Sequence, residues 1–319
     1  MIEFPPSLVN ASRPFLPTSP TDFMGLSQYG FALFIARQKM GSGLGRVLTL
    51  GRQRAAMGYG NAERLVRDAG LFWDGAKLEP TSPWGDSTLL AAGAETVNSM
   101  DYSTYESCSI VHDLNHPVKG DLVGAFDTVF DGGTLEHVYD FPTAMRNCIT
   151  ILADGGVFMA ETPSNNWMGH GFYQFSPELF YRVFCEANGC RLLSLVLFRE
   201  GLVDQIFAVD DPANVGSRVR FNVTGRTSLL VMAQKLRTTE DERGTMQQSD
   251  YQTLWRQASN DVQAQARRGT LSFLPHAWLR GLDNLRTDWE RWRNRHRGLR
   301  RLRDIPSIIQ HCTASYDRP

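Results

Sequence analysis

The sequence predicts an α/β protein built on an open, mostly parallel sheet. Short apolar runs alternate with segments of helical periodicity from about residue 46 to residue 190, which is typical of βαβ units whose helices cover both faces of a sheet. Two long apolar runs, 190–200 and 226–237, then follow without a helical pattern between them, which predicts an antiparallel pair at the end of the sheet. The 319 residues suffice for one large domain or two modest ones.

The N-terminal part, residues 1–40, is expected to form a proline-rich irregular arm followed by a helix over 22–40, whose start is signalled by Thr21 and Asp22. The arm lacks the basic and apolar regions of a signal peptide, and no run approaches the ~20 apolar residues of a membrane span. The five cysteines have no repeated spacing. These features predict a cytoplasmic protein with reduced cysteines.

A central domain, residues 41–237, contains the predicted sheet. Its first strands are the apolar runs at 46–51, 95–101, 108–114, 126–131 and 155–163. Helical patterns at 142–153 and 177–188 connect the later strands. The segment 52–94 is longer than one crossover helix requires, and part of it is expected to cap a pocket.

A polar linker, 238–252, separates this domain from a helical, basic C-terminal extension, 253–319. Between 277 and 303 there are nine arginines and three acidic residues. A tryptophan and leucine stripe recurs there at helical spacing, at Trp278, Leu282, Leu285, Trp289, Trp292 and Leu299. We expect the stripe to pack on the central domain or on a second subunit in a homo-oligomer, with peripheral contact to an anionic membrane or glycan as the alternative.

Polar residues follow the predicted strands, at the edge where open parallel sheets bind ligands. Asp101 ends the second strand, where a carboxylate can accept hydrogen bonds from the two hydroxyls of a ribose. Asp113 ends the third, where a carboxylate can bind the amino group of adenine while Leu114 packs on the ring. Each aspartate could instead cap a turn or helix. No metal site is expected, since the pair Cys185 and Cys190 lacks further ligands.

The stretch FDTVFDGGTLEHVYDF, 126–141, leaves its strand through an acid, two glycines and a Glu-His pair. Together with RVLTLGRQ, SMDYSTYE, SIVHDLN and GFYQFSPELFYRVFCEANGCRLL, it resembles the class I S-adenosylmethionine-dependent methyltransferases over about 40–236. The resemblance implies a Rossmann-like methyltransferase fold with a seven-stranded, mostly parallel sheet and an antiparallel last strand. It also implies S-adenosylmethionine as cofactor and methyl transfer to a hydroxyl of a small molecule or sugar, in glycan or secondary-metabolite biosynthesis.

The resemblance also implies roles for individual residues. The family's G-x-G-x-G loop is reduced here to Gly51, followed by Arg52 and Gln53, so Arg52 is expected to pair with the cofactor carboxylate. The implied cofactor-binding residues are Gly51, Arg52, Gln53, Asp101, Asp113, Leu114, Asp131 and Gly132. His137 and His170 are candidates for the catalytic base, and Tyr173 and Gln174 for orienting the acceptor. Either histidine could instead serve only structure, His137 as a helix cap and His170 as a partner of a loop carbonyl.

Other classes of function are weighed against this one. A formal net charge of −1 and an acidic central domain argue against nucleic acid as a partner. A nicotinamide dehydrogenase is disfavoured because no dinucleotide fingerprint follows the first strand. The loss of the glycine pattern favours one alternative, a non-catalytic scaffold with a methyltransferase-like fold that acts through its basic C-terminal helix.

Overall fold

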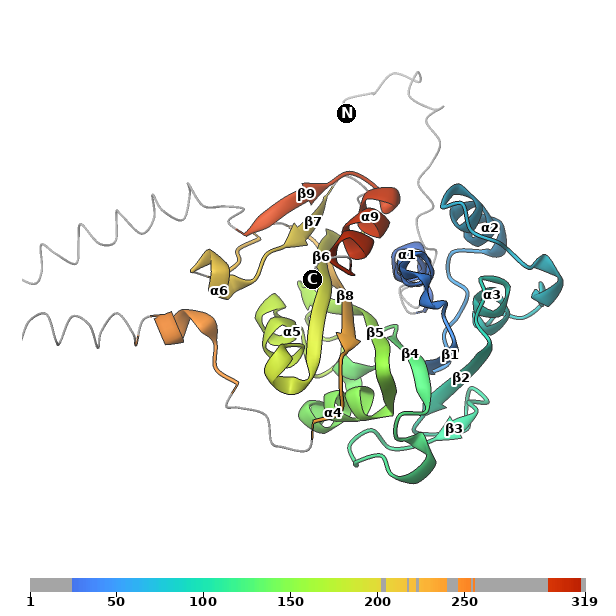
Figure 1. The fold of residues 1–319 in the computed structure, drawn as a ribbon, viewed down its shortest axis with the longest axis horizontal. Coiled ribbons are helices and arrows are strands. Elements are labelled where there is room, and N and C mark those ends of the chain that lie inside the picture. The colour runs from blue at the N-terminus through green and yellow to red at the C-terminus, as the bar shows by residue number, and fades with distance from the viewer. Residues whose placement is uncertain are drawn as a thin grey trace, which may run out of the picture.

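The computed structural model describes residues 25–201, 205–216, 218–221, 224–239, 246–253, 255 and 298–316. Within these residues one sheet of nine strands has the order β3-β2-β1-β4-β5-β8-β6-β7-β9 (Figure 1). The strands are β1 Arg46–Leu50, β2 Thr96–Asp101, β3 Ile110–Val111, β4 Phe126–Asp131, β5 Leu152–Asn165, β6 Cys190–Arg199, β7 Ile206–Val209, β8 Thr227–Lys235 and β9 Leu299–Leu302.

The first five strands in the chain pair in parallel, and the later ones are antiparallel. β1 pairs with β2 and β4, β2 with β3, and β4 with β5, all in parallel register. β8 runs antiparallel to both β5 and β6, so the predicted antiparallel pair of 190–200 and 226–237 is confirmed. The α/β class with a Rossmann-like, mixed sheet is confirmed as well.

The predicted number of seven strands is wrong. β7 pairs with β6, and β9 pairs with β7, so two further antiparallel strands extend the sheet beyond the predicted end. The pairing buries Ile206 and Ala208 of β7 and most of Leu302 of β9 in the core. Removing these apolar side chains from water is the physical reason for the extension.

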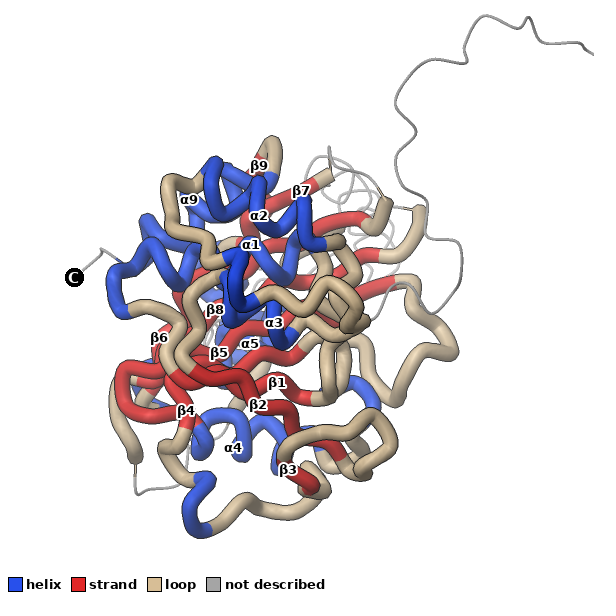
Figure 2. Tube along the Cα trace, turned by 90° about the vertical axis from the view of Figure 1, so that its right-hand side faces the viewer, coloured by secondary structure: helices blue, strands red, loops and turns tan. Residues whose placement is uncertain are grey.

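Helices cover both faces of the sheet, as Figure 2 shows for α1, α2 and α9 on one side and α4 on the other. Side chains alternate along each strand, so Phe130 of β4 packs under α1 while its neighbour Val129 packs under α4. The α-helices are α1 Gln28–Arg37, α2 Tyr59–Asp68, α3 Asp86–Ala91, α4 Phe141–Ile151, α5 Pro177–Val183, α6 Pro212–Val215 and α9 Ile305–Tyr316, and short 3-10 turns include η5 Leu135–His137 and η6 Glu186–Asn188.

α1 begins at Gln28 and not at residue 22, because Ser27 is its N-cap. The Ser27 hydroxyl oxygen accepts hydrogen bonds from the backbone N–H groups of Tyr29 (3.0 Å) and Gly30 (3.1 Å). Gly30 lies against the sheet: a Cβ there would be 2.7 Å from Oε2 of Glu161. The N-terminal end of α1 therefore approaches the end of β5.

The helix predicted over 142–153 is confirmed by α4, and the one predicted over 177–188 is shorter, because α5 ends at Val183 and only the turn η6 follows. Asn188 closes that turn by donating from Nδ2 to the carbonyl of Val183 at 2.8 Å. The segment 52–94 holds α2 and α3 and packs beside α1.

The C-terminal residues 298–316 belong to the main fold. β9 is a strand within the segment predicted to be helical, and α9 packs on α1 through Ile308, Ile309 and Cys312. Most of the tryptophan and leucine stripe lies outside the described residues, so its packing or membrane role stays a prediction, as do the domain boundaries. Ser249, in the predicted linker, donates to Glu178 of α5 from both its backbone N–H and its hydroxyl, at 2.9 Å each. Within the described residues no helix has the length and apolar character needed to cross a membrane.

Candidate functional site

Asp101 and Asp113 lie at the ends of β2 and β3, on the ligand-binding edge of the sheet. Oδ1 of Asp101 accepts a hydrogen bond from the backbone N–H of Tyr102 at 2.6 Å. Oδ1 of Asp113 accepts from the backbone N–H of Asn115 (2.9 Å) and from its Nδ2 (2.7 Å), and these bonds lower the pKa of Asp113. One oxygen of each half-buried carboxylate is thus used within its own turn. Leu114 is largely buried against α4.

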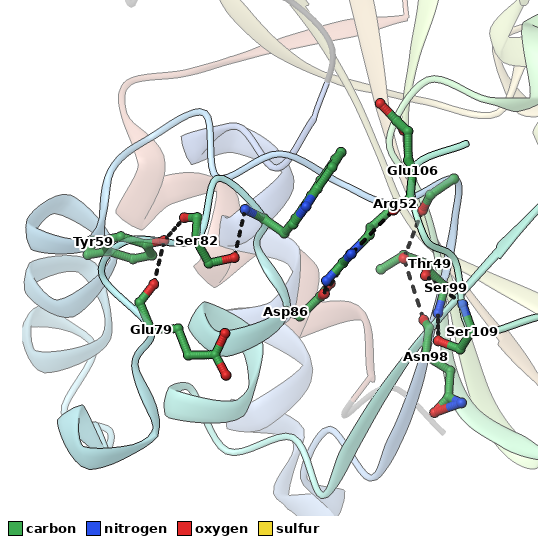
Figure 3. Close-up of polar contacts among 12 residues, drawn as sticks. Thr49, Arg52, Tyr59, Glu79, Ser82, Asp86, Asn98, Ser99, Glu106 and Ser109 are labelled. Carbon is green, nitrogen blue, oxygen red and sulfur yellow. Dashed lines mark hydrogen bonds and ion pairs between the residues drawn. The ribbon is translucent and has the colours of Figure 1, made fainter. Parts of the chain in front are cut away.

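Arg52 is held by groups of its own chain (Figure 3). Its Nε and Nη2 donate to Oδ2 of Asp86 at 3.0 and 2.8 Å, and its Nη1 donates to the carbonyl of Glu106 at 3.2 Å. The guanidinium also lies 4.9 Å from the ring centroid of Trp84. The predicted pairing with a cofactor carboxylate would require Arg52 to leave Asp86.

Gln53 fills the space beside the two glycines that were predicted to admit the cofactor. Its side chain is buried, and Nε2 donates to the carbonyl of Leu50 at 2.6 Å. A Cβ on Gly132 would lie 2.7 Å from Cδ of Gln53, and one on Gly51 would lie 3.0 Å from Oγ1 of Thr134. The gap between the ends of β1 and β4 is therefore occupied by protein atoms.

A cavity lies next to this gap, at the ends of β4, β5 and β6 and the start of β8. It holds about 20 Å³, room for roughly one water-sized group, and is partly open to solvent. Its lining residues are Gly25, Gly132, Gly133, Glu136, Glu161, Thr162, Pro163, Trp167, His170, Glu200 and Ser228. Three carboxylates and one imidazole line it, and no residue of the segment 52–94 does, so the predicted cap does not cover this cavity.

Glu136 is the most deeply placed of these carboxylates. It is fully buried, and neither carboxylate oxygen has a hydrogen bond within the described part of the chain. Oε1 lies 3.4 Å from Nε2 of His170 and 4.0 Å from Nε2 of His137, and the two imidazole rings meet edge to face. Of the two predicted catalytic histidines, His170 lines the cavity, whereas His137 is more exposed and lies beside it.

Asp131, at the end of β4, lies behind Glu136 and is fully buried. Its Oδ1 accepts from the backbone N–H groups of Thr134 (2.8 Å) and Leu135 (3.3 Å), which fixes the turn that presents Glu136. Oδ2 has no hydrogen bond among the described residues. Burial, and then the charge of Glu136, raise the pKa of Asp131 to about 8. Asp131 therefore positions the turn and does not line the cavity.

Glu161 and Glu200 form the opposite wall. Glu161 accepts a hydrogen bond from the Ser27 hydroxyl at 2.6 Å, and Glu200 accepts one from the Ser228 hydroxyl at 2.6 Å. Burial, and then the charge of Glu200, raise the pKa of Glu161 to about 8. Burial also raises the pKa of Glu200, against the smaller opposing effects of Ser228 and the Arg226 charge.

Tyr173 and Gln174, predicted to orient the acceptor, instead hold the loop that carries His170. The Tyr173 hydroxyl donates to the carbonyl of Tyr139 at 2.6 Å, and Oε1 of Gln174 accepts from the backbone N–H of Trp167 at 2.8 Å. The backbone N–H of Phe172 donates to the carbonyl of Glu136 at 2.7 Å. Neither of the two predicted residues lines the cavity, so both act on it through the loop.

Sequence reasoning missed the cavity's carboxylate wall. Glu161 was visible as the acid that ends the fifth predicted strand, and Glu200 as the acid that follows the sixth, but both were left without a role. Trp167 was also missed; it is buried, with Nε1 donating to the carbonyl of Thr227 at 2.9 Å. The signal that could have found the two acids is their position at strand ends on one edge of the sheet.

No protein-family model matches the sequence, and no curated protein matches it. Among solved structures, the chain is similar to a branched-chain polyamine synthase from Thermus thermophilus in complex with N4-aminopropylspermidine and 5'-methylthioadenosine, at 16% identity over 68% of this chain and 59% of that one, with a TM-score of 0.34. The match thus spans about three fifths of that protein.

Two methyltransferases are also similar. One is the 1,6-didemethyltoxoflavin-N1-methyltransferase of Burkholderia thailandensis with bound S-adenosylhomocysteine, at 13% identity over 66% of this chain and 78% of that one, TM-score 0.33. The other is the trans-methyltransferase CalH in complex with S-adenosylhomocysteine, at 15% identity over 64% and 54%, TM-score 0.33. Similarity of this degree does not define an activity, which has to be argued from the chain's own strands and side chains.

Proposed function

We propose that the chain is an S-adenosylmethionine-dependent methyltransferase that acts on a small molecule. The observation that supports this best is the strand order β3-β2-β1-β4-β5-β8-β6, in which β8 lies between β5 and β6 and runs antiparallel to both. A dinucleotide-binding Rossmann sheet has no antiparallel strand in this place. The order puts Gly51, Asp101 and Asp113 at consecutive strand ends on one edge.

The nucleoside half of the cofactor is compatible with this edge, and the methionine half meets an obstacle. Asp101 would hold the ribose and Asp113 the adenine; each uses Oδ1 within its own turn, and Oδ2 of Asp113 lies 3.7 Å from Nε2 of His116. The side chain of Gln53 occupies the region beside Gly132 where the methionine part is expected. Binding would therefore require Gln53 to move, and Arg52 would then lie near the cofactor's carboxylate if it exchanged Asp86 for that group.

The cofactor, when bound, supplies an activated methyl group, and the protein has to align the acceptor and exclude water. The cavity beside β4 and β5 is the place we assign to the acceptor. His170 faces it, with Nε2 3.4 Å from Oε1 of Glu136, so the charge of the carboxylate can stabilise the imidazolium that forms when the ring takes a proton from a hydroxyl. We propose that the methylated group of the acceptor is a hydroxyl.

S-adenosylhomocysteine is expected to raise the melting temperature, and NAD is not. A ligand at ~100 times its Kd stabilises by about 2.7 kcal/mol. Asp101→Asn should weaken S-adenosylhomocysteine binding by about tenfold, because it removes the charge that strengthens the hydrogen bonds of the ribose hydroxyls. His170→Ala is the matched control, since it alters the acceptor cavity and should leave this Kd within about twofold. Differential scanning fluorimetry and isothermal titration calorimetry measure both.

A second candidate is favoured by Gln53 and Arg52: a non-catalytic scaffold whose cofactor site is closed by its own side chains. If neither the wild type nor a variant without the Gln53 side chain bound S-adenosylhomocysteine, the methyltransferase proposal would be abandoned for this one. The basic C-terminal segment would then be the part to test for partners, with anionic vesicles and with measurements of subunit number.

A further inference from the structure

We propose that the carboxylate cavity binds its acceptor through a protonated alkylamine; the acceptor's role in methyl transfer rests on the proposed function, whereas the binding does not. The cavity brings Glu136, Glu161 and Glu200 together from the turn after β4, the end of β5 and the residue after β6. A small cation is the chemical class that such a wall attracts.

The charges around the cavity favour a cation as its ligand. Three carboxylates line the cavity, and a fourth, Asp131, lies buried behind Glu136. The cationic or ionisable groups that face them are Arg226, whose charge acts on Glu200, and the imidazoles of His137 and His170 beside Glu136. Among the described residues Glu161 has no cation of this kind: it accepts hydrogen bonds from the neutral Ser27 hydroxyl and from the backbone N–H of Gly30. In the part of the chain that the structure describes, the wall therefore has more acidic groups than cations that face them.

Buried hydrogen-bond acceptors in the cavity wall favour a ligand that donates hydrogen bonds. Glu136 is fully buried, yet both its oxygens lack hydrogen bonds within the described residues, and its nearest donor, Nε2 of His170, is 3.4 Å away without bonding geometry. Thr162, almost fully buried in the same wall, has a hydroxyl without a hydrogen bond to any described residue. A buried acceptor without a partner costs about 1–3 kcal/mol, and more when charged. An ammonium brings three donors and no acceptor, which suits such a wall.

The aromatic residue of the lining agrees with a cation. The Trp167 ring already carries the Arg226 guanidinium at 4.6 Å from its centroid, so this ring is placed in a cation-binding environment. A neutral hydroxyl could donate to one acceptor of the buried Glu136 carboxylate, whereas an ammonium can donate to several acceptors at once.

Entry of an ammonium should also release protons. Because burial raises the pKa of Glu161 to about 8, this carboxyl of the wall is largely protonated near neutral pH. A cation favours the ionised carboxylates, so protons move to the buffer as it binds. The number released follows from the dependence of the binding enthalpy on the buffer's ionisation enthalpy.

The test compares the binding of putrescine with that of butane-1,4-diol, the diol of the same chain length. Isothermal titration calorimetry measures both on the full-length protein without cofactor. We expect putrescine to bind at least about tenfold more tightly than the diol and to release protons. Glu136→Gln should weaken putrescine binding by about tenfold or more. Glu186→Gln is the matched control, because this exposed carboxylate lies before β6, at the opposite end of that strand from Glu200, and its substitution should leave the Kd unchanged.

Equal affinity for diamine and diol, or putrescine binding that Glu136→Gln leaves unchanged, would overturn the proposal. If Glu136→Gln does not fold, Glu200→Gln provides the same comparison. Glu136, His137 and His170 place ligand atoms within 4.8 Å of one another, so zinc chloride is titrated as well. If zinc binds and prevents putrescine from binding, the Glu136 carboxylate is a metal ligand, and this result would also overturn the proposal. Putrescine binding without any S-adenosylhomocysteine binding would uphold this inference while removing the methyltransferase function.

Discussion

Gln53→Ala is expected to tighten S-adenosylhomocysteine binding by about tenfold. In the wild type the buried Gln53 amide donates to the carbonyl of Leu50 at 2.6 Å and lies against Gly132. Moving it out of the way breaks that hydrogen bond and costs about 1–2 kcal/mol, which is subtracted from the binding free energy. The alanine variant has already lost the side chain, so the ligand no longer displaces it.

The same variant should be less stable without ligand, because it loses a buried hydrogen bond and leaves a small void. Gln234→Ala is the matched control. Gln234 is also buried and donates from Nε2 to a backbone carbonyl, that of Gly155 at 3.2 Å, but near the end of β8 farthest from the cavity. It should lose stability without any change in affinity. Calorimetric titration of both variants decides: weaker binding by Gln53→Ala would mean that Gln53 itself contacts the cofactor.

The second large effect is on the pH dependence of stability. The pKa of Asp131 and that of Glu161 are each raised to about 8 in the folded protein, and that of Glu200 is raised as well. Between about pH 4 and pH 8 the unfolded chain loses the protons of Asp131 and Glu161 while the folded one keeps them, so the free energy of unfolding falls as the pH rises. We expect a melting temperature at least about 5 °C lower at pH 8 than at pH 5.

Asp131→Asn should remove much of this slope and raise the melting temperature at pH 8. The asparagine Oδ1 can keep the hydrogen bonds from Thr134 and Leu135, while its amide can donate toward Glu136. Asp127→Asn is the opposite control: Arg46 holds the pKa of Asp127 below its usual value, with Nε 2.9 Å from Oδ2, so that substitution should reduce stability at neutral pH. Thermal melts from acid to mild alkali compare all three proteins. A wild-type melting temperature that stays level or rises across this range would contradict the prediction.

Much of the fold could be predicted because the information is local. The apolar runs around Val129 and Phe158 are strand-length and flanked by turns, and the reversed pair of β6 and β8 follows from two long runs without a helix between them. β9 could not be predicted. Its sequence, LRRL, is four residues within an arginine-rich segment, and it becomes a strand only because β7 offers an edge from a distant part of the chain.

The candidate site divides in the same way. Asp101 and Asp113 were predictable from position, since each ends a strand on the ligand-binding edge. The carboxylate wall was only partly predictable: Glu161 and Glu200 lie near strand ends, but they become neighbours only through the pairing of β5 and β6 with β8. Arg52 was recognised as unusual after Gly51, but its actual partner, Asp86, comes from the start of α3 and could be known only from tertiary packing.

The packing of α9 on α1 determines how the basic C-terminal segment can be removed for experiments. Ile308 and Cys312 cover the outer side of α1, and β9 protects the otherwise open border of β7. A protein shortened to end near residue 250 would uncover both surfaces and invite self-association through the unprotected strand. The arginine-rich stretch is therefore better excised from within, by joining the chain across 256–297, so that the closing strand and helix stay attached.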